Sequence, residues 1–281
     1  MADGDYERGR GREIAAFAAK LRRYAAARNG NGRAPGEDCD RGAQRSPLRI
    51  PDVLILNGWA ASPHAWDLFK FPRARLISYV EQLDGVPERL LDQSNNPNTP
   101  NNRTILVGWS MGGSGALRLA CRYPDRIAGL VLLAATPRMM EDKAAGWIGM
   151  SPRRLEALKY GLEITHGEGF FGVPADRPNP YCVDCPENLS RGLRYLLETD
   201  VRAELERVWR GRPQPPVWIF QSERDGIVRS ANAPYLQTIF PQATLRLIPG
   251  TEHALPVLIP ELIDEAVDTC LRLAAAGQNP A

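Results

Sequence analysis

A serine flanked by glycines marks the point where an apolar run of the chain passes into a helical pattern. The stretch "ILVGWSMGG" covers residues 105–113 and places Ser110 two positions from both Gly108 and Gly112. A serine at a sharp strand-to-helix turn adopts strained backbone angles, and neighbours with a Cβ would approach too closely. The spacing therefore predicts a nucleophile elbow, in which Ser110 carries the attacking hydroxyl and Gly108 and Gly112 are the elbow glycines.

The histidines are the candidates for the base that a serine nucleophile requires. A serine hydroxyl needs a base to take its proton, and an acidic group to orient that base. In this kind of turn the partners follow in the order serine, acid, histidine. Among the three histidines, His64 precedes the serine and His166 lies in a helical region, whereas His253 follows the last apolar run, in "IPGTEHALP". We therefore expect His253 to be the base.

Two acidic residues follow the preceding apolar run, in "PVWIFQSERDGIV". Asp225 stands directly before Gly226, and a short carboxylate in such a turn is well placed to reach a histidine on a neighbouring loop. We predict that Asp225 is the third member of the triad, with Glu223 as the alternative.

Backbone N–H groups must hold the oxyanion that forms when a serine attacks a carbonyl. The N–H of Met111 lies at the start of the helix after the serine, and the N–H of Trp59 lies in the loop "LILNGWAAS" after the first apolar run. We expect these two donors. The Trp59 indole would line an acyl pocket, unless it is an ordinary packed tryptophan. Phe170 and Phe171 are expected to line the acyl channel, or to pack the helical region on the core.

Apolar runs predict the elements that position these residues. Each run is continuous rather than alternating, as in parallel strands that are covered on both faces. Helical patterns follow several of the runs, so the chain is predicted to have an α/β fold with a mainly parallel sheet flanked by helices. The runs are "DVLILNG", "ARLISYV", "NNRTILVGWS", "RIAGLVLLAAT", "PPVWIFQS" and "ATLRLIPG".

The same patterns divide the chain into three parts. Residues 1–49 hold 11 Lys and Arg against 7 Asp and Glu, with few large apolar side chains, and are expected to form a flexible basic extension. Residues 50–136 and 213–281 form the predicted core. Residues 137–212 contain helical patterns and no strand-like run, so we predict a helical lid inserted between two strands.

Composition excludes several classes of protein. The net charge of +2 does not favour binding to nucleic acid or to an anionic membrane, and no apolar stretch is long enough to span a membrane. No apolar signal segment opens the chain, so a cytoplasmic location is expected. An odd number of cysteines, five, favours free thiols. The single C-x-x-C, Cys182 and Cys185, has no second ligand pair, so an ordinary loop is expected, with a redox or metal role as the alternative. The predicted serine chemistry needs no metal or organic cofactor.

The motifs together resemble those of the α/β-hydrolase superfamily, and within it the pimeloyl-[acyl-carrier protein] methyl ester carboxylesterases of biotin synthesis. The resemblance spans about residues 52–275 and rests on "NGWAAS", "LVGWSMGG", "YPDRIAGLVLLAATP", "GLRYLLETDVR", "ERDGIV" and "EHALP" in that order. It implies that Ser110, Asp225 and His253 form the catalytic triad. Asn57 and Gly58 replace the usual His-Gly of the oxyanion loop, so different hydrogen bonds must support that loop. No clear pair of strands precedes Asp52, so the sheet edge is expected to be reduced.

The resemblance also implies a substrate and a partner. The substrate would be a small acyl methyl ester presented on acyl-carrier protein. That partner is acidic, so a basic lid face would favour docking. Residues 137–212 are balanced, with 12 basic and 12 acidic side chains. Five basic residues could nevertheless share one face, the alternative being plain solvated helices: Arg153, Arg154, Lys159, Arg191 and Arg194.

We therefore predict a serine carboxylesterase. A general carboxylesterase or a thioesterase would use the same residues on another acyl group. An acyltransferase would replace water with an alcohol or amine acceptor. A non-catalytic binding module is the third alternative, although it would not require the three triad residues in this order.

Overall fold

The structure is a computed structural model of the chain, and it describes most of residues 52–276. The described residues are 52–69, 71, 73–92, 103–165, 180–181, 184–250 and 252–276. The predictions for residues 1–49, His166, Phe170, Phe171 and Cys182 therefore lie outside the described residues.

Six strands form one parallel sheet in the order β2-β1-β3-β4-β5-β6. They are β1 (Val53–Leu56), β2 (Ala74–Ile77), β3 (Thr104–Trp109), β4 (Ile127–Leu133), β5 (Val217–Ser222) and β6 (Thr244–Ile248). All six coincide with the apolar runs, so the predicted α/β fold with a parallel sheet is confirmed. In the described part of the chain no strand pairs with the outer edge of β2. The expectation of a reduced sheet edge concerns residues before Asp52, which lie outside the described residues.

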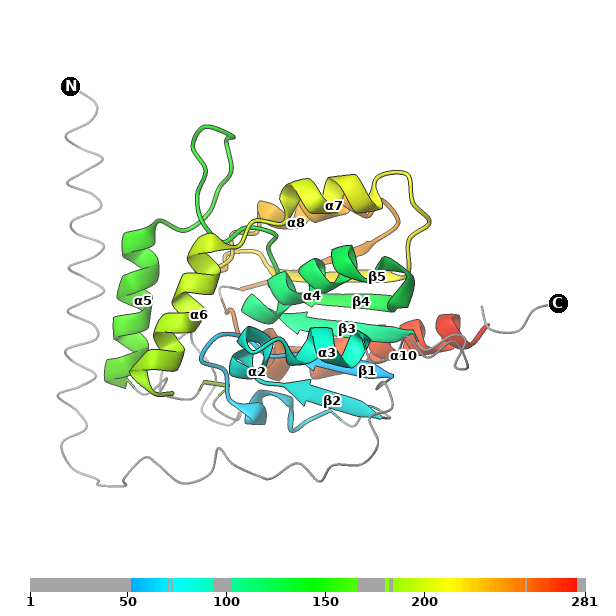
Figure 1. The fold of residues 1–281 in the computed structure, drawn as a ribbon, viewed down its shortest axis with the longest axis horizontal. Coiled ribbons are helices and arrows are strands. Elements are labelled where there is room, and N and C mark those ends of the chain that lie inside the picture. The colour runs from blue at the N-terminus through cyan, green and yellow to red at the C-terminus, as the bar shows by residue number, and fades with distance from the viewer. Residues whose placement is uncertain are drawn as a thin grey trace.

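Helices cover both faces of this sheet (Figure 1). They are α2 (Tyr79–Leu83), α3 (Val86–Asp92), α4 (Met111–Arg122), α5 (Pro152–Thr165), α6 (Pro186–Glu198), α7 (Arg202–Trp209), α8 (Asn232–Ile239), α9 (Leu255–Leu258) and α10 (Pro260–Ala276), with short 3-10 turns at Pro63–Trp66 and Pro124–Arg126. No helix among the described residues is long and apolar enough to cross a membrane.

Two buried clusters explain why the strands are apolar throughout. On one face, Val107 and Val131 pack with Ile263 and Val267 of α10. On the other face, residues of β1, β3 and β4 pack with α3, α4, α7 and α8. Burying a side chain of this size contributes about 1.5–3 kcal/mol, so both sides of each central strand favour the folded state.

The helices of residues 137–212, the predicted lid, lie in two places. Helices α5 and α6 lie side by side, next to one end of the sheet (Figure 1). Helix α7 instead joins the layer of α4 and α8, because Leu205 and Trp209 are buried in that cluster. That residues 137–212 form an inserted lid, with these boundaries, stays a prediction.

A cluster of charged side chains links the start of α7 to the segment after β4. Asp200 lies between α6 and α7 and accepts hydrogen bonds from Arg138 Nη1 at 2.7 Å and from Arg202 Nη2 at 2.8 Å. Arg202 also pairs with Asp142 at 2.8 Å and lies over the Trp147 ring. Burial alone would raise the pKa of Asp200, but the hydrogen bonds from Arg202 and Arg138 outweigh it and lower the pKa from 3.8 to about 2.

This low pKa predicts a pH-dependent contribution to stability. A carboxylate whose pKa is lower in the folded state stabilises that state above its unfolded value, and the contribution disappears as the pH falls. We expect Asp200→Asn to lower the free energy of unfolding at pH 5 and above. The difference from wild type should shrink between pH 3.8 and about 2.

Urea unfolding at a series of pH values measures this difference. Asp125→Asn is the control, because Asp125 forms an exposed ion pair with Arg212 and such pairs contribute at most about 1 kcal/mol. A difference between wild type and Asp200→Asn that stays constant down to pH 2 would contradict the prediction.

Candidate active site

The elbow serine occupies the strained turn that its sequence predicts. Ser110 joins β3 to α4 with φ 57° and ψ −117°. A Cβ on Gly108 would lie 2.5 Å from the carbonyl oxygen of Gly112, and a Cβ on Gly112 would lie 2.0 Å from that of Leu56. Both distances are shorter than van der Waals contact, so only glycine permits this turn.

A buried chain of hydrogen bonds starts at this serine. Ser110 Oγ lies 2.8 Å from His253 Nε2, and His253 Nδ1 lies 2.7 Å from Asp225 Oδ2. Ser110, His253 and Asp225 are 8%, 2% and 2% exposed, respectively. An ionised carboxylate only accepts hydrogen bonds, so Nδ1 carries the proton and Nε2 is left as an acceptor for the serine hydroxyl. This is the arrangement in which the imidazole removes the serine proton.

Asp225 is held by its own turn as well as by the histidine. Its Oδ1 accepts hydrogen bonds from the backbone N–H of Ile227 at 2.7 Å and of Val228 at 3.1 Å. The side-chain amide of Gln221, the buried penultimate residue of β5, donates to Oδ2 at 3.3 Å. Glu223, the alternative acid, is exposed, and the acidic partner of His253 is Asp225.

The other described histidine lies apart from this chain. His64 is exposed in the 3-10 turn after β1, and its Nδ1 pairs with Asp67 Oδ2 at 2.7 Å. No group of three His, Cys, Asp or Glu side chains in the described ranges is arranged to hold a metal ion.

The loop after β1 passes directly beside the serine. A Cβ on Gly58 would lie 3.5 Å from Ser110 Cβ. A turn closes this loop through a hydrogen bond from Ala61 N to Gly58 O, and Ala60 takes a positive φ of 53°. One of the two predicted oxyanion donors, the Trp59 N–H, belongs to this turn. The other, the Met111 N–H, belongs to the first residue of α4. An N–H at the start of a helix has no acceptor within its own helix.

Asn57 holds this loop in shape, and sequence reasoning missed its role. The buried Asn57 amide donates to the carbonyl oxygens of Ala61 at 3.1 Å and Ser62 at 3.2 Å. Its Oδ1 accepts from Gly58 N at 3.1 Å and from Trp66 Nε1 at 2.9 Å. The sequence did signal that the hydrogen bonds of this loop differ, because Asn57-Gly58 stands where His-Gly is usual. The four hydrogen bonds of the Asn57 side chain are what supports the loop here.

The Trp59 indole connects the same loop to helix α6. Its Nε1 donates to Leu189 O at 3.1 Å, and a Cβ on Gly192 would lie 2.4 Å from Trp59 Cδ1. Gly192 is therefore the residue that lets α6 lie directly on the indole. That the indole lines an acyl pocket stays a prediction, as do the roles of Phe170 and Phe171, which lie outside the described residues.

Tyr181 is a further residue that the sequence did not single out. The segment that carries it runs beside the loop after β1, with Ser62 N donating to Pro180 O at 2.8 Å. The Tyr181 ring is buried, with its centroid 5.8 Å from that of Trp109. Burial and then the charge of Asp225 raise the pKa of Tyr181 well above its ordinary value, so the phenol stays neutral beside the carboxylate.

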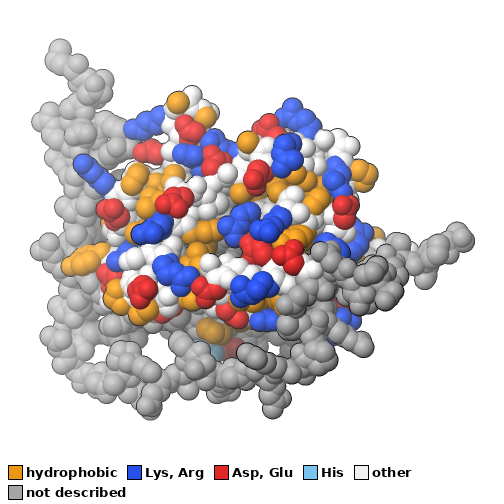
Figure 2. Space-filling model, viewed as in Figure 1, with side chains coloured by type: hydrophobic (Ala, Val, Ile, Leu, Met, Phe, Trp, Pro, Cys, Tyr) orange, Lys and Arg blue, Asp and Glu red, His pale blue; other side chains and the backbone are white. Residues whose placement is uncertain are grey.

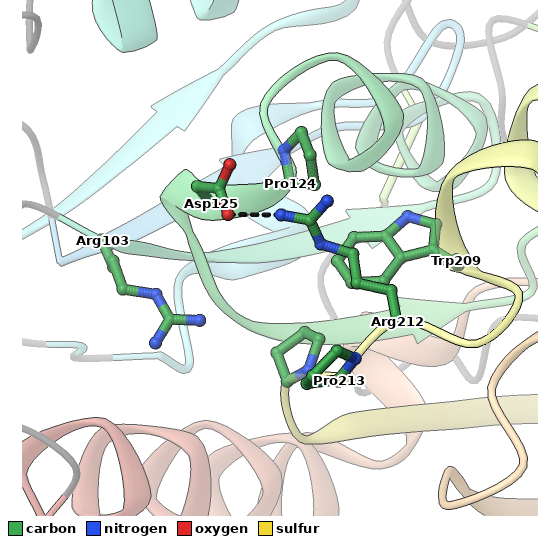
Figure 3. A pocket seen from close by; sticks show the side chains of 7 residues that line it. Arg103, Pro124, Asp125, Trp209, Arg212 and Pro213 are labelled. Atoms are coloured by element: carbon green, nitrogen blue, oxygen red, sulfur yellow. Dashed lines mark hydrogen bonds and ion pairs between the residues drawn. The ribbon is translucent and has the colours of Figure 1, made fainter.

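A separate cavity of about 560 Å³ lies at the amino ends of the central strands, at the opposite end from Ser110. Its lining residues Arg103, Asp125 and Pro215 precede β3, β4 and β5, whereas Ser110 follows β3. Figure 3 shows Arg212 paired with Asp125 beside the indole of Trp209. This cavity is therefore separate from the hydrogen-bonded residues Ser110, His253 and Asp225, which lie at the carboxyl ends of the strands.

Comparison with known families places this geometry in context. The model of the alpha/beta hydrolase family matches residues 42–266. A pimeloyl-[acyl-carrier protein] methyl ester esterase of Nitrosomonas europaea is 28% identical over 246 residues, which cover 75% of this chain and 92% of that protein. A protein of the same name from Aromatoleum aromaticum is also 28% identical, over 74% of this chain and 92% of its own length.

Solved structures share the fold at lower identity. A hydrolase from Pseudomonas aeruginosa superposes with a TM-score of 0.58 and 20% identity, covering 79% of this chain and 89% of its own. The enol-lactonase of Burkholderia xenovorans gives a TM-score of 0.58 and 17% identity, covering 79% and 92%. At these identities the likeness concerns the fold alone.

Asn57→Asp tests the support of the loop after β1. The substitution keeps the shape of the side chain but turns a carboxylate oxygen toward the carbonyl oxygens of Ala61 and Ser62. Breaking buried hydrogen bonds and leaving an uncompensated charge costs about 3–5 kcal/mol, so we expect the free energy of unfolding to fall by about 3 kcal/mol or more.

The control is Gln237→Glu, the same amide-to-carboxylate change at a half-buried position whose amide donates only at 3.4 Å. Urea unfolding should detect a change of less than about 1 kcal/mol there. Equal losses in both variants would show that Asn57 does not hold the loop.

Proposed function

Because the chain belongs to the alpha/beta hydrolase family, we propose that it is a serine carboxylesterase that demethylates pimeloyl-[acyl-carrier protein] methyl ester in biotin synthesis. The observation that carries the proposal is the chain of hydrogen bonds from Ser110 through His253 to Asp225. The choice of substrate is supported by the names of the relatives that match three quarters of the chain.

The proposed reaction has two halves. Ser110 Oγ attacks the ester carbonyl carbon while His253 Nε2 takes the hydroxyl proton. The N–H groups of Trp59 and Met111 hold the oxyanion of the tetrahedral intermediate. When the intermediate collapses, His253 returns the proton to the departing methanol and the acyl group stays on Ser110. Water, deprotonated by His253, then releases the carboxylic acid and restores the serine.

Asp225 has a separate task in this cycle. It keeps the proton on His253 Nδ1, so that Nε2 faces the serine, and it stabilises the imidazolium that forms. Its remaining hydrogen bonds from Ile227, Val228 and Gln221 fix the carboxylate itself. The carboxylate can therefore orient the ring without moving during the reaction.

Docking of a carrier protein is the proposed role of the basic residues on α5 and α6. Three of the five already have partners: Arg154 donates to Gly226 O, Lys159 pairs with Glu163, and Arg191 pairs with Asp84. Arg153 and Arg194 are exposed, and neither forms an ion pair within the described part of the chain. The face seen in Figure 2 mixes basic and acidic side chains, so any docking there depends on a few cations rather than on a single-sign patch.

Turnover of three esters tests the proposed function. The esters are pimeloyl-[acyl-carrier protein] methyl ester, free monomethyl pimelate and p-nitrophenyl butyrate, each with wild type and with Ser110→Ala. We expect wild type to cleave the carrier-bound ester most efficiently. Loss of the nucleophile should lower kcat by at least about 1,000-fold, since it removes the covalent pathway.

Other outcomes would change the proposal in defined ways. Cleavage of the aryl ester alone, through Ser110, would indicate a general esterase and remove the pimeloyl substrate. Equal efficiency on carrier-bound and free methyl esters would remove the docking role of Arg153 and Arg194. Transfer to an added alcohol in preference to water would indicate an acyltransferase. No Ser110-dependent turnover of any ester would contradict esterase activity.

A further inference from the structure

Trp109 connects the nucleophile to the loop that carries the base. It is the last residue of β3, directly before Ser110, and its side chain is 1% exposed. Its indole Nε1 donates to the backbone carbonyl oxygen of His253 at 2.9 Å. The residue beside the nucleophile therefore forms a hydrogen bond to the main chain of the base, 144 positions further along the chain.

The loop of His253 depends on side chains for its position. It lies between β6 and α9, outside any strand or helix, and it follows Gly250, whose φ is 126°. Glu252 O accepts a hydrogen bond from Ser222 Oγ at 2.5 Å, and His253 O accepts from Leu255 N at 2.9 Å as well as from Trp109. Two successive carbonyl groups of this loop are thus held by side chains of β5 and β3.

The indole ring also touches the other parts of the site. Its centroid lies 5.9 Å from that of the His253 ring and 5.8 Å from that of Tyr181. A Cβ on Gly58 would lie 3.3 Å from Trp109 Cε3, so the loop after β1 packs on the same ring. One buried side chain therefore contacts the base, the loop beside the serine and the segment of Tyr181.

We infer that Trp109 is a positioning residue, whose indole N–H acts with the Ser222 hydroxyl to fix the His253 loop so that Nε2 stays within hydrogen-bond distance of Ser110. This inference rests on the proposed function and deepens it. The imidazole must keep its distance to Ser110 while it gains and loses a proton in each half of the reaction. A misplacement of about 1 Å in a reacting group can lower a rate by about 100-fold, so a single hydrogen bond to the loop matters for the chemical steps.

Trp109→Phe tests the inference, because phenylalanine keeps an aromatic ring but removes the N–H donor. The matched control is Trp209→Phe. Trp209 is also 1% exposed, but its indole Nε1 has no hydrogen-bond partner among the described residues. Both variants make the same exchange in a buried position, and only one of them removes a hydrogen bond to the base loop.

The measurement is kcat and KM for p-nitrophenyl butyrate, together with the thermal midpoint of each variant. We expect Trp109→Phe to lower kcat about 10-fold with KM changed less than about 2-fold, within the range expected when a catalytic group is slightly misplaced. Trp209→Phe should leave kcat within about 2-fold of wild type. Because a smaller folded fraction alone would also lower the apparent kcat and leave KM unchanged, kcat is expressed per folded enzyme, and a general packing defect is recognised by its lower thermal midpoint with kcat per folded enzyme unchanged.

Ser222→Ala is the second variant, and it decides the matter if Trp109→Phe does not fold. It removes the other side-chain donor to the loop and should also lower kcat with KM unchanged. Equal kcat values for Trp109→Phe and Trp209→Phe would overturn the inference. If Trp109→Phe does not fold, an unchanged kcat for Ser222→Ala would overturn it. Absence of Ser110-dependent turnover in wild type would instead overturn the proposed function, so the two failures are distinguishable.

Discussion

The close approach of helix α4 to the first strand is the constraint on which the rest of the site depends. The carbonyl oxygen of Leu56 lies where a Cβ on Gly112 would stand, 2.0 Å away, so α4 begins almost in contact with the end of β1. That approach forces Ser110 into its φ of 57° and brings the loop after β1 beside the serine. A side chain at Gly112 would separate the start of α4, which carries one proposed oxyanion donor, from the loop after β1, which carries the other.

The parallel sheet then brings the acid and the base to the same end of the strands as the serine. Ser110 follows β3, Asp225 follows β5 and His253 follows β6, and parallel strands end on one side of their sheet. Each loop is short and is fixed by buried hydrogen bonds, such as those from Ile227 N and Val228 N to Asp225. The side chains of the site are therefore attached to the ends of strands that the two apolar clusters hold in place.

The sequence predicted those features that depend on local patterns. The elbow was visible because the turn requires glycine at fixed positions, and the strands were visible because burial on both faces makes their sequences continuously apolar. The contacts of Asn57, Trp59 and Trp109 could not be predicted, because their partners lie on other elements. The Trp59 indole, for example, bonds to a residue 130 positions away, where Gly192 leaves room for it. Tyr181 gave no signal, since a single tyrosine in an irregular segment has no pattern to mark it.

Covalent labelling of the intact protein with a fluorophosphonate tests the central claim most directly, because the reagent reacts only with a serine that an adjacent base activates. The account predicts a single adduct by mass spectrometry, located on Ser110 and absent from Ser110→Ala, with labelling at least about 100-fold slower in His253→Ala. An unlabelled wild type, or an adduct that persists in Ser110→Ala, would contradict it.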